Sequence, residues 1–432
     1  MDKVSLFRRL GLGLPGVMLV PVILIWTPFG FGSDQPVPPS TAQARDKAKP
    51  LDLATCRSLA LQNQPALTAY RASLEAAVLK GQAMDNLGIG ASLIAHDLPI
   101  RKQQGRLGLE IAQARVRQAE QEAIYAVTRN YLVLLYARQQ QDLLDKAVEN
   151  LKDLKETVRQ IVEDGLRKDV TTRDLERVNV LLLLAEGHLE EATNGQERAR
   201  AALREAMGFG EGFSFDIVGR ILPNPDIKFT KQQIVDLARN RRAELLQVTD
   251  AAGVFALEMK AQATTRHIKV NTFVAGADLH ADPVPQGIHN SEYRPGAVGP
   301  EMSPILVGSK SERVEQASAY YTRAQAVVEK TRNLIDLEAE NAFLLWREAS
   351  RKTARLGNAA DKAEKLSRDL KEDFKQPGAK VNLDELVLTG ILAAQLRGQT
   401  NDAIRDLALT LANLERITAG GVVVDFTLPT KP

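Results

Sequence analysis

The sequence predicts a mainly α-helical fold of two tandem repeats, each containing a long antiparallel coiled-coil helical hairpin, with a small β portion. Heptad steps of three and four residues form one seam, at Leu175, Val178, Leu182, Ala185, Leu189, Ala192, Gln196, Ala199, Leu203 and Ala206. About 211 residues later a second seam follows, at Leu386, Thr389, Ala393, Leu396, Thr400, Ala403, Leu407, Thr410, Leu414 and Ile417. A glycine turn precedes each seam, at Gly165 and at Gly378.

Composition agrees with long, slender helices. Of the 432 residues, 44% are hydrophobic but only 5% are aromatic, so the helix layers are expected to be thin. The 56 basic and 54 acidic residues are interspersed, which gives no reason to expect a nucleic-acid partner. The single cysteine, Cys56, excludes an intrachain disulfide framework, and we expect it to be a packed small residue.

Residues 1–44 are predicted to be a signal peptide, or an anchor, followed by a Pro-rich linker. Basic residues at 3, 8 and 9 precede the apolar run 10–26, and Ala42-Gln43-Ala44 offers a small-residue cleavage site. Cleavage near Gly32 and an uncleaved anchor are the alternatives. In either case most of the chain is expected to leave the cytoplasm.

The first repeat, residues 51–210, is predicted to contain four helices and one stub of strand. No proline lies between Pro99 and Pro223, so a helix can run uninterrupted there. The expected helices cover 52–64, 65–84 and 101–163, with a return from Thr171 or Thr172 to Ala206 and a strand stub at 89–95.

The second repeat, residues 240–420, follows a linker at 211–239 that holds a short helix capped by Thr230. Alternation of Ile268, Val270, Thr272 and Val274 with polar residues predicts a strand, and the β-hairpin is expected over 267–307. Helices are expected over 242–265 and 309–374 and along the second seam, and a tail covers 421–432.

The layout resembles the TolC-like outer-membrane efflux protein family over nearly the whole mature chain. The resemblance is carried by LDLATCRSLALQNQPALTAYRASLEAA from Leu51, RNYLVLLYA from Arg129, DGLRKDV, NRRAELLQVTDAA from Asn240, GPEMSPILVGSKSERVEQASA from Gly299, PGAKVNLDEL and LANLERITAGG. It implies a homotrimer whose helices form a trimeric α-helical barrel in the periplasm and whose strands lie in the outer membrane. One departure is that the stub at 89–95 is too short to cross a membrane twice.

The resemblance also implies partners and sites. It implies a channel component of a tripartite efflux or type I secretion system that docks to a periplasmic adaptor (membrane fusion protein) and, through it, to an inner-membrane pump. The family's adaptor-docking tips correspond to Gly165, Leu166, Arg167, Gly378, Ala379 and Lys380, and its tunnel-entrance acid corresponds to Asp384. Asp384 is also explained as an ordinary acid at a helix start.

No catalytic motif is present, so we expect no enzyme, cofactor or resident metal. His280 lies between Asp278 and Asp282, a spacing that can ligate a metal, but ordinary loop chemistry is favoured. The rival interpretation is a periplasmic coiled-coil adaptor or structural protein, anchored by its N-terminus and without a pore. Two hairpins and little β structure favour the conduit over the adaptor.

Overall fold

The computed structural model describes residues 50–88, 95–165, 167, 169–225, 228–273, 299–374 and 381–426. The predicted signal segment, most of the strand stub, the second turn at Gly378, the loop holding His280 and the last six residues lie outside this part. The chain divides into a unit at residues 1–47, which is not described, and the unit at 48–432 that carries every element below.

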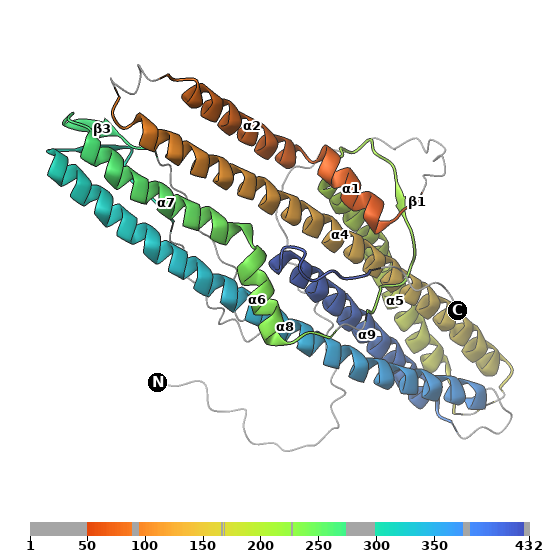
Figure 1. The fold of residues 1–432 in the computed structure, drawn as a ribbon. Helices are drawn as coiled ribbons and strands as arrows, with labels where there is room; N and C mark the ends of the chain where they lie inside the picture. The colour runs from red at the N-terminus through yellow and green to blue at the C-terminus, as the bar shows by residue number, and fades with distance from the viewer. Residues whose placement is uncertain are drawn as a thin grey trace, which may run out of the picture. The chain divides into compact units, whose positions relative to one another are not determined.

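The described chain is dominated by helices that repeat in length and order (Figure 1). In the first half they are α1 (Leu53–Asn63), α2 (Pro65–Asp85), α4 (Leu98–Glu163) and α5 (Thr172–Ala206). In the second half they are α6 (Lys231–Arg241), α7 (Ala243–Thr264), α8 (Lys310–Phe374) and α9 (Leu383–Ile417). The predicted helices are therefore confirmed, with α4 beginning three residues earlier than expected because Pro99 is accommodated in its first turn.

Local capping explains where several helices begin. Asp52 accepts a hydrogen bond from the Thr55 N–H at 2.7 Å and so starts α1. Thr230 and Gln233 exchange side-chain and backbone hydrogen bonds at the start of α6, which confirms the predicted cap. None of the helices in the described ranges is long and apolar enough to span a membrane.

The predicted β-hairpin at 267–307 is described only at its two ends, because residues 274–298 lie outside the described part. Strand β3 (Lys269–Asn271) pairs antiparallel with β4 (Ile305–Val307), and Val270 lies opposite Leu306. Ile268 was expected on the same face as Val270, but it precedes the strand and is exposed, whereas Val270 is buried. Phe273 ends the alternation because its ring packs beside Gly108 and under the Lys80 ammonium group.

A second, parallel pair was not predicted. It joins β1 (Pro50–Leu51) to β2 (Asp216–Ile217), and the Arg138 guanidinium holds β2 by donating to the Ile217 and Gly219 carbonyls. Two-residue strands leave no periodic pattern in a sequence, which is why they were missed.

Helix packing follows the repeat. The long helices α4 and α8 pair with their return helices α5 and α9, and the halves meet where α4 contacts α9 and α7. Along each long helix the two shorter helices follow one another: α2 and α5 beside α4, α7 and α9 beside α8 (Figure 1). The main core lies midway and includes the tail side chains Val422, Val424 and Phe426.

Short helices meet end to end at two joints: α5 meets the break between α1 and α2, and α9 meets the break between α6 and α7. At the first joint the two parts of the chain approach closely through backbone atoms. Where α5 meets the break between α1 and α2, the Gln64 amide donates to the Glu205 and Ala206 carbonyls, both at 3.2 Å. Gly208, with φ +85°, lies so close that a Cβ there would be 2.6 Å from the Asn63 carbonyl carbon and oxygen. This joint therefore requires glycine at 208.

Candidate functional site

The first candidate site is the end of the molecule where both hairpins turn. A separate apolar cluster fills this end and takes members from both hairpins: Val158, Val170, Val178, Phe374, Leu383 and Leu386. It is distinct from the main core, so the two hairpin ends are held together by their own packing. We refer to this end as the tip.

The first turn is built on Gly165. Its φ of +64° is left-handed, and no atom lies within 4 Å of the place where a Cβ would sit, so the turn is exposed and open. Thr171 then starts α5, and Asp174 accepts from both the Thr171 N–H (2.9 Å) and its hydroxyl (2.8 Å). These hydrogen bonds, the backbone one first, lower the pKa of Asp174. Helix α4 therefore ends at a glycine with a left-handed φ, and α5 begins at a threonine that is bonded to a carboxylate. Together these two features give a sharp, pre-formed turn.

Arg167 reaches from the first turn to the second hairpin. Its guanidinium donates to both Asp169 oxygens and to the Val381 carbonyl, at 3.0 Å, just before α9. It also lies over the Phe374 ring, 4.8 Å from the centroid. Hydrogen bonding to Arg167 lowers the pKa of Asp169. These contacts of Arg167 join the two hairpins of one chain at the tip.

Asp384 makes a second link. The Arg177 guanidinium of α5 donates to its carboxylate at 2.8 Å, and both side chains are more than half exposed. Asp384 is also the second residue of α9, whose N-cap Asn382 accepts from the Asp384 N–H. The position therefore combines a favourable helix-start acid with a link between hairpins, although a solvent-exposed pair of this kind contributes little stability.

The predicted tip residues are thus only partly placed. Gly165, Arg167 and Asp384 lie together at the tip, whereas Leu166, Gly378, Ala379 and Lys380 fall outside the described residues. Sequence reasoning missed Arg177 and Phe374. Arg177 carries one weak signal, a basic residue three positions after the capping Asp174, but nothing in the sequence pairs it with a residue 207 positions away.

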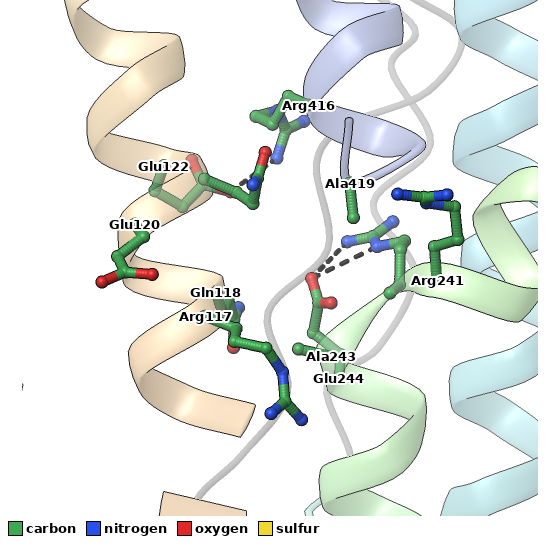
Figure 2. Close-up of a pocket in the computed structure, with 11 residues that line it drawn as sticks. Arg117, Gln118, Glu120, Glu122, Arg241, Ala243, Glu244, Arg416 and Ala419 are labelled. Carbon is green, nitrogen blue, oxygen red and sulfur yellow. Dashed lines mark hydrogen bonds and ion pairs between the residues drawn. The ribbon is translucent and has the colours of Figure 1, made fainter. Parts of the chain in front are cut away.

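A hollow of about 470 Å³ lies at the other joint, where the end of α9 meets the break between α6 and α7 beside α4. Arg416 donates to Glu122 at 3.1 Å (Figure 2), and Arg242 donates to Glu244 at 2.6 Å. Arg242 also pairs with Glu338 of α8. Burial raises the pKa of Glu244, but its charge pairing with Arg242 outweighs that effect and leaves the pKa below its usual value.

These ion pairs fasten helices to one another and offer no reactive group. Across the described ranges, no three histidine, cysteine or carboxylate side chains gather in a way that would hold a metal ion. The loop around His280, for which ordinary loop chemistry was favoured over metal ligation, is not among those ranges.

Comparison with known proteins places the fold. No protein-family model and no curated relative matches the sequence. Among solved structures, the outer-membrane channel OprN is 15% identical with a TM-score of 0.67, and the match covers 85% of this chain and 90% of that chain.

Two further channels agree with it. The outer membrane protein VceC of Vibrio cholerae is 14% identical with a TM-score of 0.64, over 85% of this chain and 96% of that one. The Campylobacter jejuni CmeC channel is 11% identical with a TM-score of 0.64, over 90% and 94%. The resemblance to TolC-like channels and the predicted fold class are confirmed at the level of the fold.

Proposed function

We propose that this chain is the outer-membrane channel component of a tripartite efflux or type I secretion system, a passive conduit with no chemistry of its own. The observation that carries the proposal is the match of nearly the whole chain to outer-membrane channels. The conduit would extend from the outer membrane into the periplasm, and transport energy would come from an inner-membrane pump.

The repeat supports assembly from several copies. Within the chain, α4 of the first half contacts α7 and α9 of the second half. The equivalent contact, α8 of the second half with α2 and α5 of a first half, is open in one chain and can be made only by another copy. Helix α2 has one buried residue, Leu67, whereas its counterpart α7 has eight, which is what a missing neighbour would leave.

Helix α5 presents the side chains for such a contact. On the face turned away from its own seam, Val180, Leu183 and Leu184 are 57–62% exposed. On α8, Leu366 is 52% exposed, and it lies eight residues before the tip end of α8, as Val180 lies eight residues after the tip end of α5. In a ring with cyclic symmetry these two side chains come to the same level.

Charge is complementary along the same two helices. Residues 178–197 of α5 carry four glutamates and no lysine or arginine. Residues 351–368 of α8 carry six basic residues, and the only two acids there, Asp361 and Glu364, already bind Arg397. Glu191 and Arg355 lie nineteen residues from their respective tip ends, so they too would meet. The ring is proposed to be a homotrimer, as the resemblance implies.

At the entrance, three copies of the tip would form the docking surface for a periplasmic adaptor. The proposed contacts are Gly165, Leu166, Arg167, Gly378, Ala379 and Lys380. Three copies of Asp384 would form a ring of carboxylates at the entrance, and because Arg177 of the same chain pairs with each of them, the field of this ring would be partly neutralised. The contact of Arg167 with the Val381 carbonyl would help to hold each protomer's hairpins together there, next to the exposed Arg177–Asp384 pair.

Cysteine cross-linking tests the ring. Val180→Cys combined with Leu366→Cys places thiols on opposite edges of one chain, so a short bifunctional thiol reagent can join them only between copies. We expect covalent trimers from outer-membrane fractions. The matched control pairs Val180→Cys with Leu344→Cys, which is exposed on α8 but thirty residues from the tip end, and should give monomers.

Recovery of the chain with inner membranes as a monomer would contradict the proposal. An open ladder of cross-linked species beyond the trimer would contradict the closed ring.

A further inference from the structure

A buried charged network joins the two halves at the end opposite the tip. We call it the seam network: Arg101 and Gln104 of α4, Glu258 and Gln262 of α7, and Arg313 of α8. Glu258, Gln104 and Gln262 are fully buried and Arg313 is 1% exposed. Charged side chains are rarely buried to this degree unless they are paired.

Each member of the network is hydrogen-bonded to at least one other member. Arg101 pairs with both oxygens of Glu258, and Gln104 donates to Glu258 at 2.9 Å and to the Val254 carbonyl at 3.0 Å. Gln262 donates to Glu258 at 2.8 Å and accepts from Arg313 at 2.9 Å.

The network also contacts the pair of strands β3 and β4. Arg101 donates to the Asn271 carbonyl of β3 at 3.2 Å, and Arg313 donates to the Gly308 carbonyl just after β4 at 2.7 Å. Asp97 accepts from Arg101 at 3.0 Å, so two guanidiniums balance two carboxylates.

Elsewhere along the interface between α4 and α7, no further ion pair joins the two helices among the described residues. Gly253 lies against Leu107, a small residue against a flexible one. Gln118 and Gln247 share one amide hydrogen bond of 2.8 Å. Between these contacts the buried Asp250 carboxylate leaves one oxygen without a partner among the described residues. None of these contacts opposes a slide of one helix along the other as strongly as a buried ion pair does.

We propose that the seam network fixes the register between the two halves. It determines the single position that α7 takes along α4. A slide of one helical turn, about 5.4 Å, would move Glu258 beyond hydrogen-bonding reach of Arg101 and leave a buried charge unpaired. Apolar side chains of similar volume impose no such penalty, because they pack nearly as well one turn away. The inference concerns the position of α7 on α4 within one chain and does not depend on the proposed conduit.

The test measures the register by cross-linking the full-length chain. Gln118→Cys with Gln247→Cys reports the native register, and Gln118→Cys with Ala251→Cys reports a slide of one turn. A short bis-methanethiosulfonate reagent joins each pair. Cys56 does not compete, because it is fully buried and burial raises the pKa of its thiol to about 12.

The polar contacts of the seam network between α4 and α7 are removed by combining Arg101→Met, Gln104→Leu and Glu258→Leu. We expect the helical content to be retained and the yield of the shifted cross-link to rise at least tenfold over the wild-type background. Glu258→Gln keeps the shape and removes the charge, so it should fold and give an intermediate yield. If the triple variant does not fold, the yield from Glu258→Gln decides alone.

The matched control removes a polar pair elsewhere between the halves, Gln139→Leu with Asn401→Leu, whose side chains are bonded at 2.9 Å between α4 and α9. It should leave the shifted cross-link at background. The proposal is overturned if the shifted yield stays at background in the folded network variants, or if the control raises it equally.

Discussion

Replacing Gly208 by alanine should be among the most damaging small changes in the chain. The residue has φ +85°, where a side chain costs about 1–2 kcal/mol. A Cβ there would also lie 2.6 Å from the Asn63 carbonyl group and 2.7 Å from the Gln64 nitrogen, which are backbone atoms that cannot rotate away. Overpacking of this kind costs about 1–3 kcal/mol, so the total is about 2–5 kcal/mol.

Two other glycines separate the causes. Gly165 has φ +64° but open space around it, so Gly165→Ala should cost only the conformational part, about 1–2 kcal/mol. Gly212 has neither a left-handed φ nor a neighbour within 4 Å, so Gly212→Ala should be neutral or slightly stabilising. Urea unfolding of the three full-length variants, followed by circular dichroism at 222 nm, measures the differences. If Gly208→Ala lowers the unfolding midpoint no more than Gly165→Ala does, the close approach at the joint is not rigid.

Two other buried charges lead to predictions. Burial and the nearby Glu110 raise the pKa of Asp250, so its contribution favours folding below its unfolded pKa and is lost as pH rises through the folded pKa. Asp250→Asn should therefore gain stability relative to wild type as pH rises from 4 to 7 in urea titrations, and a constant difference would refute the assignment. Arg242→Met would leave two largely buried carboxylates unpaired and should cost about 3–5 kcal/mol in the same assay. Arg159→Met, which removes only exposed pairs, should leave the unfolding midpoint unchanged, and equal midpoints for the two variants would contradict the reasoning.

The tip shows how far a sequence can identify a site. Gly165 is recognisable because a helix stop followed by a capped helix start has a local signature. For Arg167, the nearby carboxylate of Asp169 is visible in the sequence, whereas the Val381 carbonyl and the Phe374 ring belong to the other hairpin.

The sequence by itself determined the long helices, their return seams and the doubling of the unit. These follow from local rules: proline-free stretches allow uninterrupted helices, and a 3.5-residue apolar period requires lengthwise packing. The tail was harder, because alternation of Val422, Val424 and Phe426 over so few residues is too short a signal to distinguish a buried segment from a loose end.

Only the tertiary structure decided which charges meet. Glu258 has no feature in the sequence that separates it from the many solvated glutamates of the other helices, yet it is fully buried against Arg101, 157 residues away. Gly208 likewise reads as an ordinary helix stop until Asn63 is brought against it. Such contacts depend on how helices from distant parts of the chain are placed side by side, and periodicity specifies which face of a helix is buried but not which partner it meets.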